Sequence, residues 1–337
     1  MKVPSLKHVL LNQLETALSQ NCEESTARFT DFSYKKNDVS DAIVANSEHL
    51  SIDWQQIPLK KKQNILPVLY TSALVKRIVA SGLTASGETP LEASRRLINR
   101  LNQARASLSS KLSDELLESW RQPLSIEAQL WLAFQIETQR PGWIAFRLTP
   151  AGTHQWLMYL SNFGLKTPVV PARGARLKGK PSDQQAADWL WQAQYAYACC
   201  CRRLRQYQQQ WPQLDSQRPN SQLDCRDNEH SFQTFQSQRS EQSLVHALVS
   251  TADDLFWIPY RWPDRQYLLL LKSVVPLCQA FERFERTYSS GLTQYSAIGH
   301  LEAMAMRSHT LLLLKATEKI LKTLLEEHLD EPAPERL

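Results

Sequence analysis

Apolar residues recur three or four positions apart over most of this chain, and that spacing predicts a mainly α-helical protein. The first 20 residues are predicted to form one amphipathic helix, with an apolar face of Leu6, Val9, Leu10, Leu14, Ala17 and Leu18. Residues 21–50 are polar and irregular in pattern. A helix is predicted from Pro67 to Ala80, ended by Gly82, because glycine readily adopts the backbone conformation that closes a helix. Pro90 starts the next helix, whose buried face is expected to be Leu91, Leu97, Ile98 and Leu101.

Two segments depart from helical spacing. Residues 124–136 and 142–148 are predicted to be short strands, the second because Ile144–Leu148 loosely alternates apolar and polar side chains. The second segment follows Pro141-Gly142, a pair typical of turns. Residues 1–160 are therefore expected to form a smaller α+β domain.

The rest of the chain is predicted to be a helical bundle after a linker. Residues 161–186 hold prolines and a basic cluster and are expected to be this linker, so the helical domain covers 187–337. Its first helix spans about 187–210, and a glutamine-rich stretch at about 211–242 is expected to be a mobile loop because it has few apolar anchors. Three helices follow, and the last, about 307–328, is expected to bury Leu313, Leu314, Ile320, Leu321, Leu324 and Leu325. The clearest, 265–288, has apolar residues at helical spacing and is expected to kink at Pro276: Tyr267, Leu270, Leu271, Val274, Cys278, Phe281 and Phe284.

The charge of the chain changes this picture only modestly. Its formal net charge of +5 permits a nucleic-acid partner without requiring one. Five basic residues and no acidic ones lie between residues 161 and 180: Lys166, Arg173, Arg176, Lys178 and Lys180. This cluster is either a solvated linker or a strap that contacts phosphates, and the sequence leaves both interpretations open.

Motifs for common enzyme classes are missing from the sequence. It has no GxxxxGK[ST] loop, no GxGxxG, no HExxH and no GxSxG. The eight histidines are scattered, and the six cysteines have no zinc-site spacing. We therefore predict a protein that is not an enzyme and that has no metal site and no cofactor.

The termini and the cysteines indicate a compartment. The N-terminal segment lacks the long apolar core of a signal peptide, and no apolar run is long enough to span a bilayer. Cys199, Cys200 and Cys201 are adjacent, which is poor geometry for disulfides among them and suits a reducing environment. A cytoplasmic protein without a membrane partner is expected.

Three stretches of the C-terminal half resemble a known family. Residues 194–205 read QYAYACCCRRLR, similar to the QYAHARxxSxLR helix that opens the anticodon-binding (DALR) domain of arginyl-tRNA synthetases. Tyr197 stands at the family's histidine and Cys199 at its arginine. Residues 265–288 resemble the aromatic helix of that domain. The chain ends APERL, where the family ends APERM.

The first domain resembles the N-terminal added domain of the same synthetases, more weakly. Its PGWIAFRL stretch, 141–148, matches a PGFINxxL pattern in which the family's asparagine contacts the D-loop of tRNA. Ala145 stands at that position here, and an alanine side chain forms no such hydrogen bond.

The resemblance implies a helical anticodon-binding domain whose partner is tRNA, with arginine tRNA as the expected species. The interval from Leu160 to Tyr195 is too short for the synthetase catalytic fold, and HIGH and KMSKS-type motifs do not occur. A non-catalytic tRNA-binding protein acting in translation or tRNA handling is therefore expected, without adenylation activity of its own. Two alternatives remain: a protein-interaction or structural module that has lost RNA binding, and an accessory to arginylation in trans.

The candidate tRNA contacts lie on the first helix and at the chain end: Tyr195, Tyr197, Arg202, Arg203, Arg205, Arg336 and Leu337. RNA loops are bound by stacking unpaired bases on aromatic or guanidinium planes. The competing interpretation is that the tyrosines belong to the core, the arginines to a solvated face, and the tail to the packing of the domain.

Overall fold

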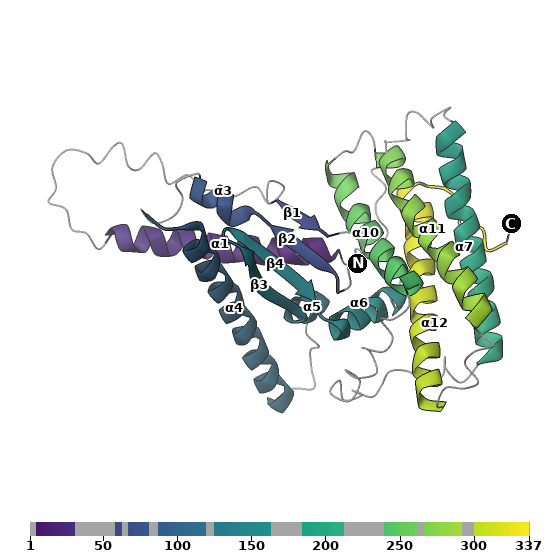
Figure 1. The fold of residues 1–337 in the computed structure, drawn as a ribbon, viewed down its shortest axis with the longest axis horizontal. Coiled ribbons are helices and arrows are strands. Elements are labelled where there is room, and N and C mark those ends of the chain that lie inside the picture. Colours follow the sequence, from purple (N-terminus) through teal and green to yellow (C-terminus); the bar gives the residue numbers. More distant parts are fainter. Residues whose placement is uncertain are drawn as a thin grey trace. The chain divides into compact units, whose positions relative to one another are not determined.

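The structure is a computed structural model, and it describes residues 5–30, 58–62, 67–80, 87–118, 125–162, 184–211, 239–261, 266–291 and 300–336. Over these residues the protein is mainly helical, with one small sheet (Figure 1). The chain divides into two compact units. The helical unit comprises Leu148–Leu337 with Met1–Leu6 and Gln63–Val68, and the mixed unit comprises Lys7–Lys62 and Leu69–Arg147.

The mixed unit contains a four-stranded sheet in the order β1-β2-β4-β3. Its strands are β1 (Leu59–Lys61), β2 (Leu69–Ser72), β3 (Phe134–Arg140) and β4 (Trp143–Leu148). β2 is antiparallel to both neighbours, with Leu59 opposite Ser72 and Leu69 opposite Arg147. The helices of this part of the chain are α1 (Leu6–Thr30), α3 (Leu74–Ala80), α4 (Pro90–Glu118) and α5 (Ile126–Leu132).

Gly142 makes the turn between β3 and β4. Its φ of +78° lies in the left-handed region, and a Cβ at this position would collide with the side chain of Lys76. The Gly142 backbone N–H donates to Ser94 Oγ at 3.0 Å, which ties the turn to α4. The turn predicted at Pro141-Gly142 is confirmed.

Three local predictions for this unit were wrong. Leu69–Ser72 is a strand rather than the start of a helix, because all four residues are buried between β1 and β4. Ile126–Leu132 is a helix rather than a strand, and the Ser125 hydroxyl accepts a bond from the backbone N–H of Ala128 at 3.3 Å to cap it. The opening helix continues to Thr30, ten residues beyond the amphipathic segment.

The helical unit is built around four long helices that lie side by side in Figure 1. They are α7 (Gln184–Gln210), α10 (Arg239–Arg261), α11 (Gln266–Gly291) and α12 (His300–Lys322). A π-helical turn, η5 (Thr323–His328), extends α12. α7 packs on α11 and α12, and α10 packs on the same two helices.

Hydrogen bonds fix the direction of α7 against its neighbours. Cys200 lies opposite Leu314 and Tyr207 opposite Arg307, so α7 and α12 are antiparallel. Arg203 meets Glu285 and Tyr207 meets Tyr288, so α7 and α11 are parallel.

The apolar faces predicted in the C-terminal half are confirmed. All seven apolar residues expected on the inner face of α11 are buried, with Pro276 inside the helix. The last helix, expected at about 307–328, is α12 with its η5 extension, and it buries Leu313, Leu314, Ile320, Leu321, Leu324 and Leu325. The kink at Pro276 stays a prediction.

The boundaries of the units differ from the division made on the sequence. Helix α6 (Pro150–Asn162) packs on α12 and so belongs to the helical unit, although 1–160 was assigned to the α+β domain. Its buried Trp156, Leu157 and Leu160 supply the apolar stripe for this contact. α7 begins three residues before 187, and α10 begins at Arg239, inside the predicted loop. The basic linker cluster lies outside the described residues, as does most of that loop.

None of the helices in the described ranges is both long and apolar enough to cross a membrane. Over the same ranges, no three His, Cys, Asp or Glu side chains are grouped in a way that would hold a metal ion.

Candidate functional site

Two aromatic side chains are stacked on the outer surface of α7. Trp191 and Tyr195 are one helical turn apart, with ring centroids 5.2 Å apart and planes inclined by only 15°. Trp191 is 57% exposed and Tyr195 39%, although most large apolar side chains described in this unit are buried. We call this pair the α7 platform. It presents flat aromatic surface to solvent at a fixed place on the bundle.

Tyr197, the other predicted tyrosine, lies in the core. Only 2% of its surface is exposed. Burial raises the pKa of its phenol, and a hydrogen bond with Cys201 raises it further. Its ring is therefore inaccessible to a nucleic-acid base, and its assignment as an RNA contact was wrong. The alternative considered for the tyrosines, a core position, is confirmed for Tyr197 but not for Tyr195.

Two predicted arginines share one carboxylate on α11. Arg203 Nε lies 2.8 Å from Glu285 Oε1, and Arg202 Nη2 lies 3.5 Å from the same oxygen. Arg203 also donates to Gln206 at 3.1 Å. The Arg202 side chain remains 58% exposed, whereas that of Arg203 is 30% exposed. Arg202 is thus the more accessible guanidinium, and Arg203 mainly braces α7 against α11.

Arg205 makes its contacts with the C-terminal tail of the chain. Its guanidinium donates to the backbone carbonyl of Glu335 at 2.9 Å, and Gln194 donates to the carbonyl of Pro332 at 3.1 Å. The tail leaves η5 through Asp330, whose φ of 53° turns the chain. The tail therefore packs along α7, as the packing interpretation expected. Arg336 is exposed, and Leu337 lies outside the described residues.

The structure thus brings Tyr195 and Arg202 to accessible positions on α7 and gives Arg203 and Arg205 intramolecular partners. Sequence reasoning missed Trp191. The signal was present, because Trp191 precedes Tyr195 by four residues and such pairs share a helix face.

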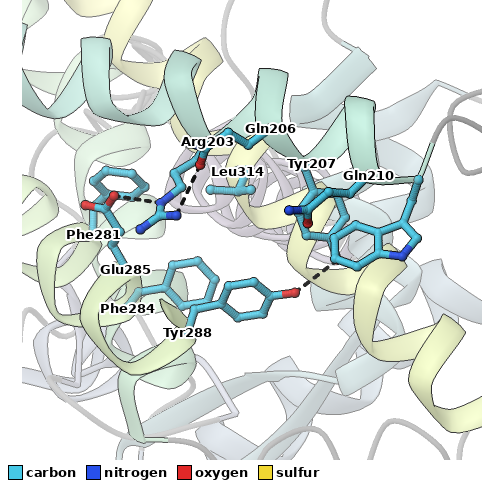
Figure 2. Close-up of a pocket in the computed structure, with 10 residues that line it drawn as sticks. Arg203, Gln206, Tyr207, Gln210, Phe281, Phe284, Glu285, Tyr288 and Leu314 are labelled. Carbon is cyan, nitrogen blue, oxygen red and sulfur yellow. Dashed lines mark hydrogen bonds and ion pairs between the residues drawn. The ribbon is translucent and has the colours of Figure 1, made fainter. Parts of the chain in front are cut away.

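An aromatic pocket lies further along α7, near its C-terminal end (Figure 2). The space between its walls is continuous with solvent, and the two together amount to about 450 Å³. Three helices contribute its lining: Arg203, Gln206, Tyr207, Gln210 and Trp211 from the α7 end, Phe281, Phe284, Glu285 and Tyr288 from α11, and Leu314 from α12.

Hydrogen bonds order the rings of this pocket. The Tyr207 hydroxyl donates to the backbone carbonyl of Arg307 at 3.0 Å and lies 3.2 Å from the Tyr288 hydroxyl. The Arg307 guanidinium sits 4.8 Å from the centre of the Trp211 ring, a cation–π contact that holds the indole. The walls are therefore fixed by the fold.

The helical segment carries no excess of positive charge. From residue 184 to the end, the sequence has 16 Lys and Arg and 18 Asp and Glu. The positive excess of the chain thus comes from residues before α7. Binding of a polyanion by the bundle would depend on stacking and on a few accessible arginines more than on a general positive field.

No protein-family model, curated protein or solved structure matches the chain. The similarity to arginyl-tRNA synthetases accordingly rests on the motifs at residues 194–205, 265–288 and the chain end, and it stays a prediction.

Proposed function

We propose that the helical unit is a non-catalytic RNA-binding module that contacts unpaired bases through the α7 platform. The observation that carries this proposal is the exposed, stacked pair of Trp191 and Tyr195. Aromatic stacking on unpaired bases is the usual way in which proteins bind single-stranded RNA loops. The motif resemblance supports tRNA as the ligand in this proposal, with arginine tRNA as the first species to test.

The platform and Arg202 form a short continuous surface in this proposal. Arg202 follows Tyr195 by two helical turns and so points to the same side of α7. A base stacks on the exposed ring surface, with a contribution on the order of 1–3 kcal/mol. The exposed guanidinium of Arg202 is placed for a phosphate or a neighbouring base, while Glu285 fixes its position.

Salt dependence tests this proposal. We expect labelled arginine tRNA to bind the full chain at low salt and to lose affinity as salt rises, because bound phosphates release condensed counterions. With few accessible arginines on the bundle, the slope of log affinity against log salt should be shallow, roughly −1 to −3. Fluorescence anisotropy at 50 and 200 mM salt, with total tRNA as a comparison, measures it. Absence of binding at 50 mM salt contradicts the proposal.

A protein-interaction module is the second candidate function, and a specific observation favours it. Glu285 partners Arg202 and Arg203, and the tail partners Arg205, so three basic residues of α7 serve contacts within the bundle. An exposed Trp–Tyr pair is also typical of the centre of a protein interface. The two functions separate on the titration above: a protein interface predicts no saturable tRNA binding at either salt concentration.

A further inference from the structure

The aromatic pocket is separate from the α7 platform. Tyr195 and Tyr207 are 12 residues apart on one helix, which corresponds to roughly 18 Å along its axis. None of the residues that line the pocket belongs to the platform. A ligand in the pocket would therefore occupy a second site on the bundle.

The shape of the pocket favours a flat ring. In Figure 2 the rings of Phe284 and Tyr288 lie across the hollow from the side chains of Arg203 and Gln206, with Leu314 behind. Phe284 and Tyr288 are themselves near-parallel, 5.8 Å between centroids and 23° between planes. A planar heteroaromatic group fits such walls because aromatic rings and guanidinium planes both stack on it.

The polar part of the lining offers both hydrogen-bond acceptors and donors. The acceptors are the Glu285 carboxylate, the glutamine amide oxygens and the tyrosine hydroxyl oxygens, of which Glu285 Oε1 and Gln206 Oε1 already accept from Arg203. The donors are the glutamine amide N–H groups and the Arg203 guanidinium. The last turn of α7 adds backbone carbonyls that have no partner further along the helix, although Trp211 N–H already occupies that of Tyr207 at 3.0 Å. A suitable ligand therefore brings N–H donors together with acceptors, as a nucleobase edge does.

The charge of the pocket excludes simple ions as the preferred ligand. Glu285 is already neutralised by Arg202 and Arg203, so a cation gains little there. An anion would face the same carboxylate and the negative end of the α7 dipole. A neutral planar ring with amino or ring N–H donors meets neither obstacle.

We propose that this pocket binds a nucleobase, with its ring between the aromatic wall and Arg203 and its N–H groups directed at Glu285 and the glutamine amides. The base can belong to a free nucleoside or to an RNA chain. The proposal does not depend on RNA binding by the α7 platform, because the free nucleoside alone satisfies the same chemistry.

Titration with free nucleosides tests the pocket directly. Adenosine, guanosine, cytidine and uridine are added to the full chain, and binding is followed by saturation-transfer NMR and calorimetry. At least one of the four should bind saturably. We expect Tyr288→Ala to weaken it about ten-fold or more through lost stacking, and Gln206→Ala to weaken it several-fold through a lost hydrogen bond. Gln206 is exposed, so Gln206→Ala should fold and still tests nucleoside binding by the pocket if Tyr288→Ala does not fold.

A control variant and a tRNA titration show whether the bound base is that of a free nucleoside or of an RNA chain. Gln209→Ala, which changes an exposed glutamine of the same helix that does not line the pocket, should leave nucleoside affinity unchanged. Anisotropy with labelled tRNA then distinguishes an RNA base, for which Gln206→Ala weakens tRNA binding, from a free nucleoside, for which it does not. Nucleoside binding without tRNA binding would support the pocket while contradicting the RNA-binding function. The pocket proposal is overturned if no nucleoside binds, or if both pocket variants bind as the unaltered protein does.

Discussion

Acidification from pH 7 to pH 4.5 should destabilise the helical unit, because three partly buried histidines are held there in the neutral form. Burial lowers the pKa of His154, His309 and His328 to about 4 each, and neighbouring His154 lowers that of His309 further. In the unfolded chain their pKa returns to the ordinary histidine value of 6.5. The unfolded state therefore binds more protons than the folded state between pH 6.5 and pH 4.

The sign of the effect follows from this difference. The stabilising contribution of the neutral histidines is complete above pH 6.5 and is lost as the pH falls toward 4. At pH 4.5 the loss is roughly 2–3 kcal/mol for each histidine. Buried carboxyls oppose it: burial raises the pKa of Glu241 to about 7, so that group favours the folded state as the pH falls from 7 to 4.5. The net loss should thus be nearer that of two histidines than three.

Replacement of one histidine isolates the effect. In His309→Gln, the free energy of unfolding should depend less on pH between 7 and 4.5 than in the unaltered protein, by roughly 2–3 kcal/mol. Denaturant titrations at several pH values measure the difference, with the exposed neighbour Ser308→Ala as control. An identical pH dependence in His309→Gln and Ser308→Ala would show that His309 is not buried as a neutral base.

Trp156→Ala should cost about 3–5 kcal/mol in the free energy of unfolding of the helical unit. Trp156 is fully buried on α6, and α6 packs on α12. Removing the indole deletes a large apolar contact and leaves a cavity that the surrounding helices only partly close. This prediction tests the assignment of α6 to the helical unit, since α6 comes directly after strand β4 in the sequence.

Trp191→Ala is the matched control, since it makes the same substitution at a tryptophan that is 57% exposed. It should change the free energy of unfolding by no more than about 0.5 kcal/mol. Thermal and denaturant unfolding of both variants, followed by circular dichroism at 222 nm, gives the comparison. Equal losses in the two variants, or a larger loss for Trp191→Ala, would contradict the placement of these side chains.

Long periodic segments of the fold were predictable from the sequence. The inner faces of α11 and α12 were identified residue by residue. Apolar side chains three or four positions apart lie on one face of a helix, and that face is buried in a bundle. Short apolar segments were not. Leu69–Ser72 became a strand because β1 and β4 lie on both sides of it, and those partners are distant in sequence.

The candidate site was also predictable only in part: residues of one helix could be identified, but their partners on other elements could not. The sequence identified Tyr195 and Arg202 as candidates on the helix that became α7, and both are accessible. The partners of the arginines come from far along the chain: Glu285 is 82 residues from Arg203, and Glu335 is 130 residues from Arg205. A sequence pattern contains no information on such pairs. Only the packing of α11 and the tail on α7 reveals them.

The most direct test of RNA binding by the α7 platform is a tRNA titration of the double variant Trp191→Ala/Tyr195→Ala. Both side chains are exposed, so the variant should fold as the unaltered protein does. Leu268→Ala, which removes an exposed apolar side chain from α11, is the control. We predict that the dissociation constant for arginine tRNA at 50 mM salt rises about ten-fold or more in the double variant and stays unchanged in the control. Equal affinity in the double variant and the unaltered protein would contradict the proposal.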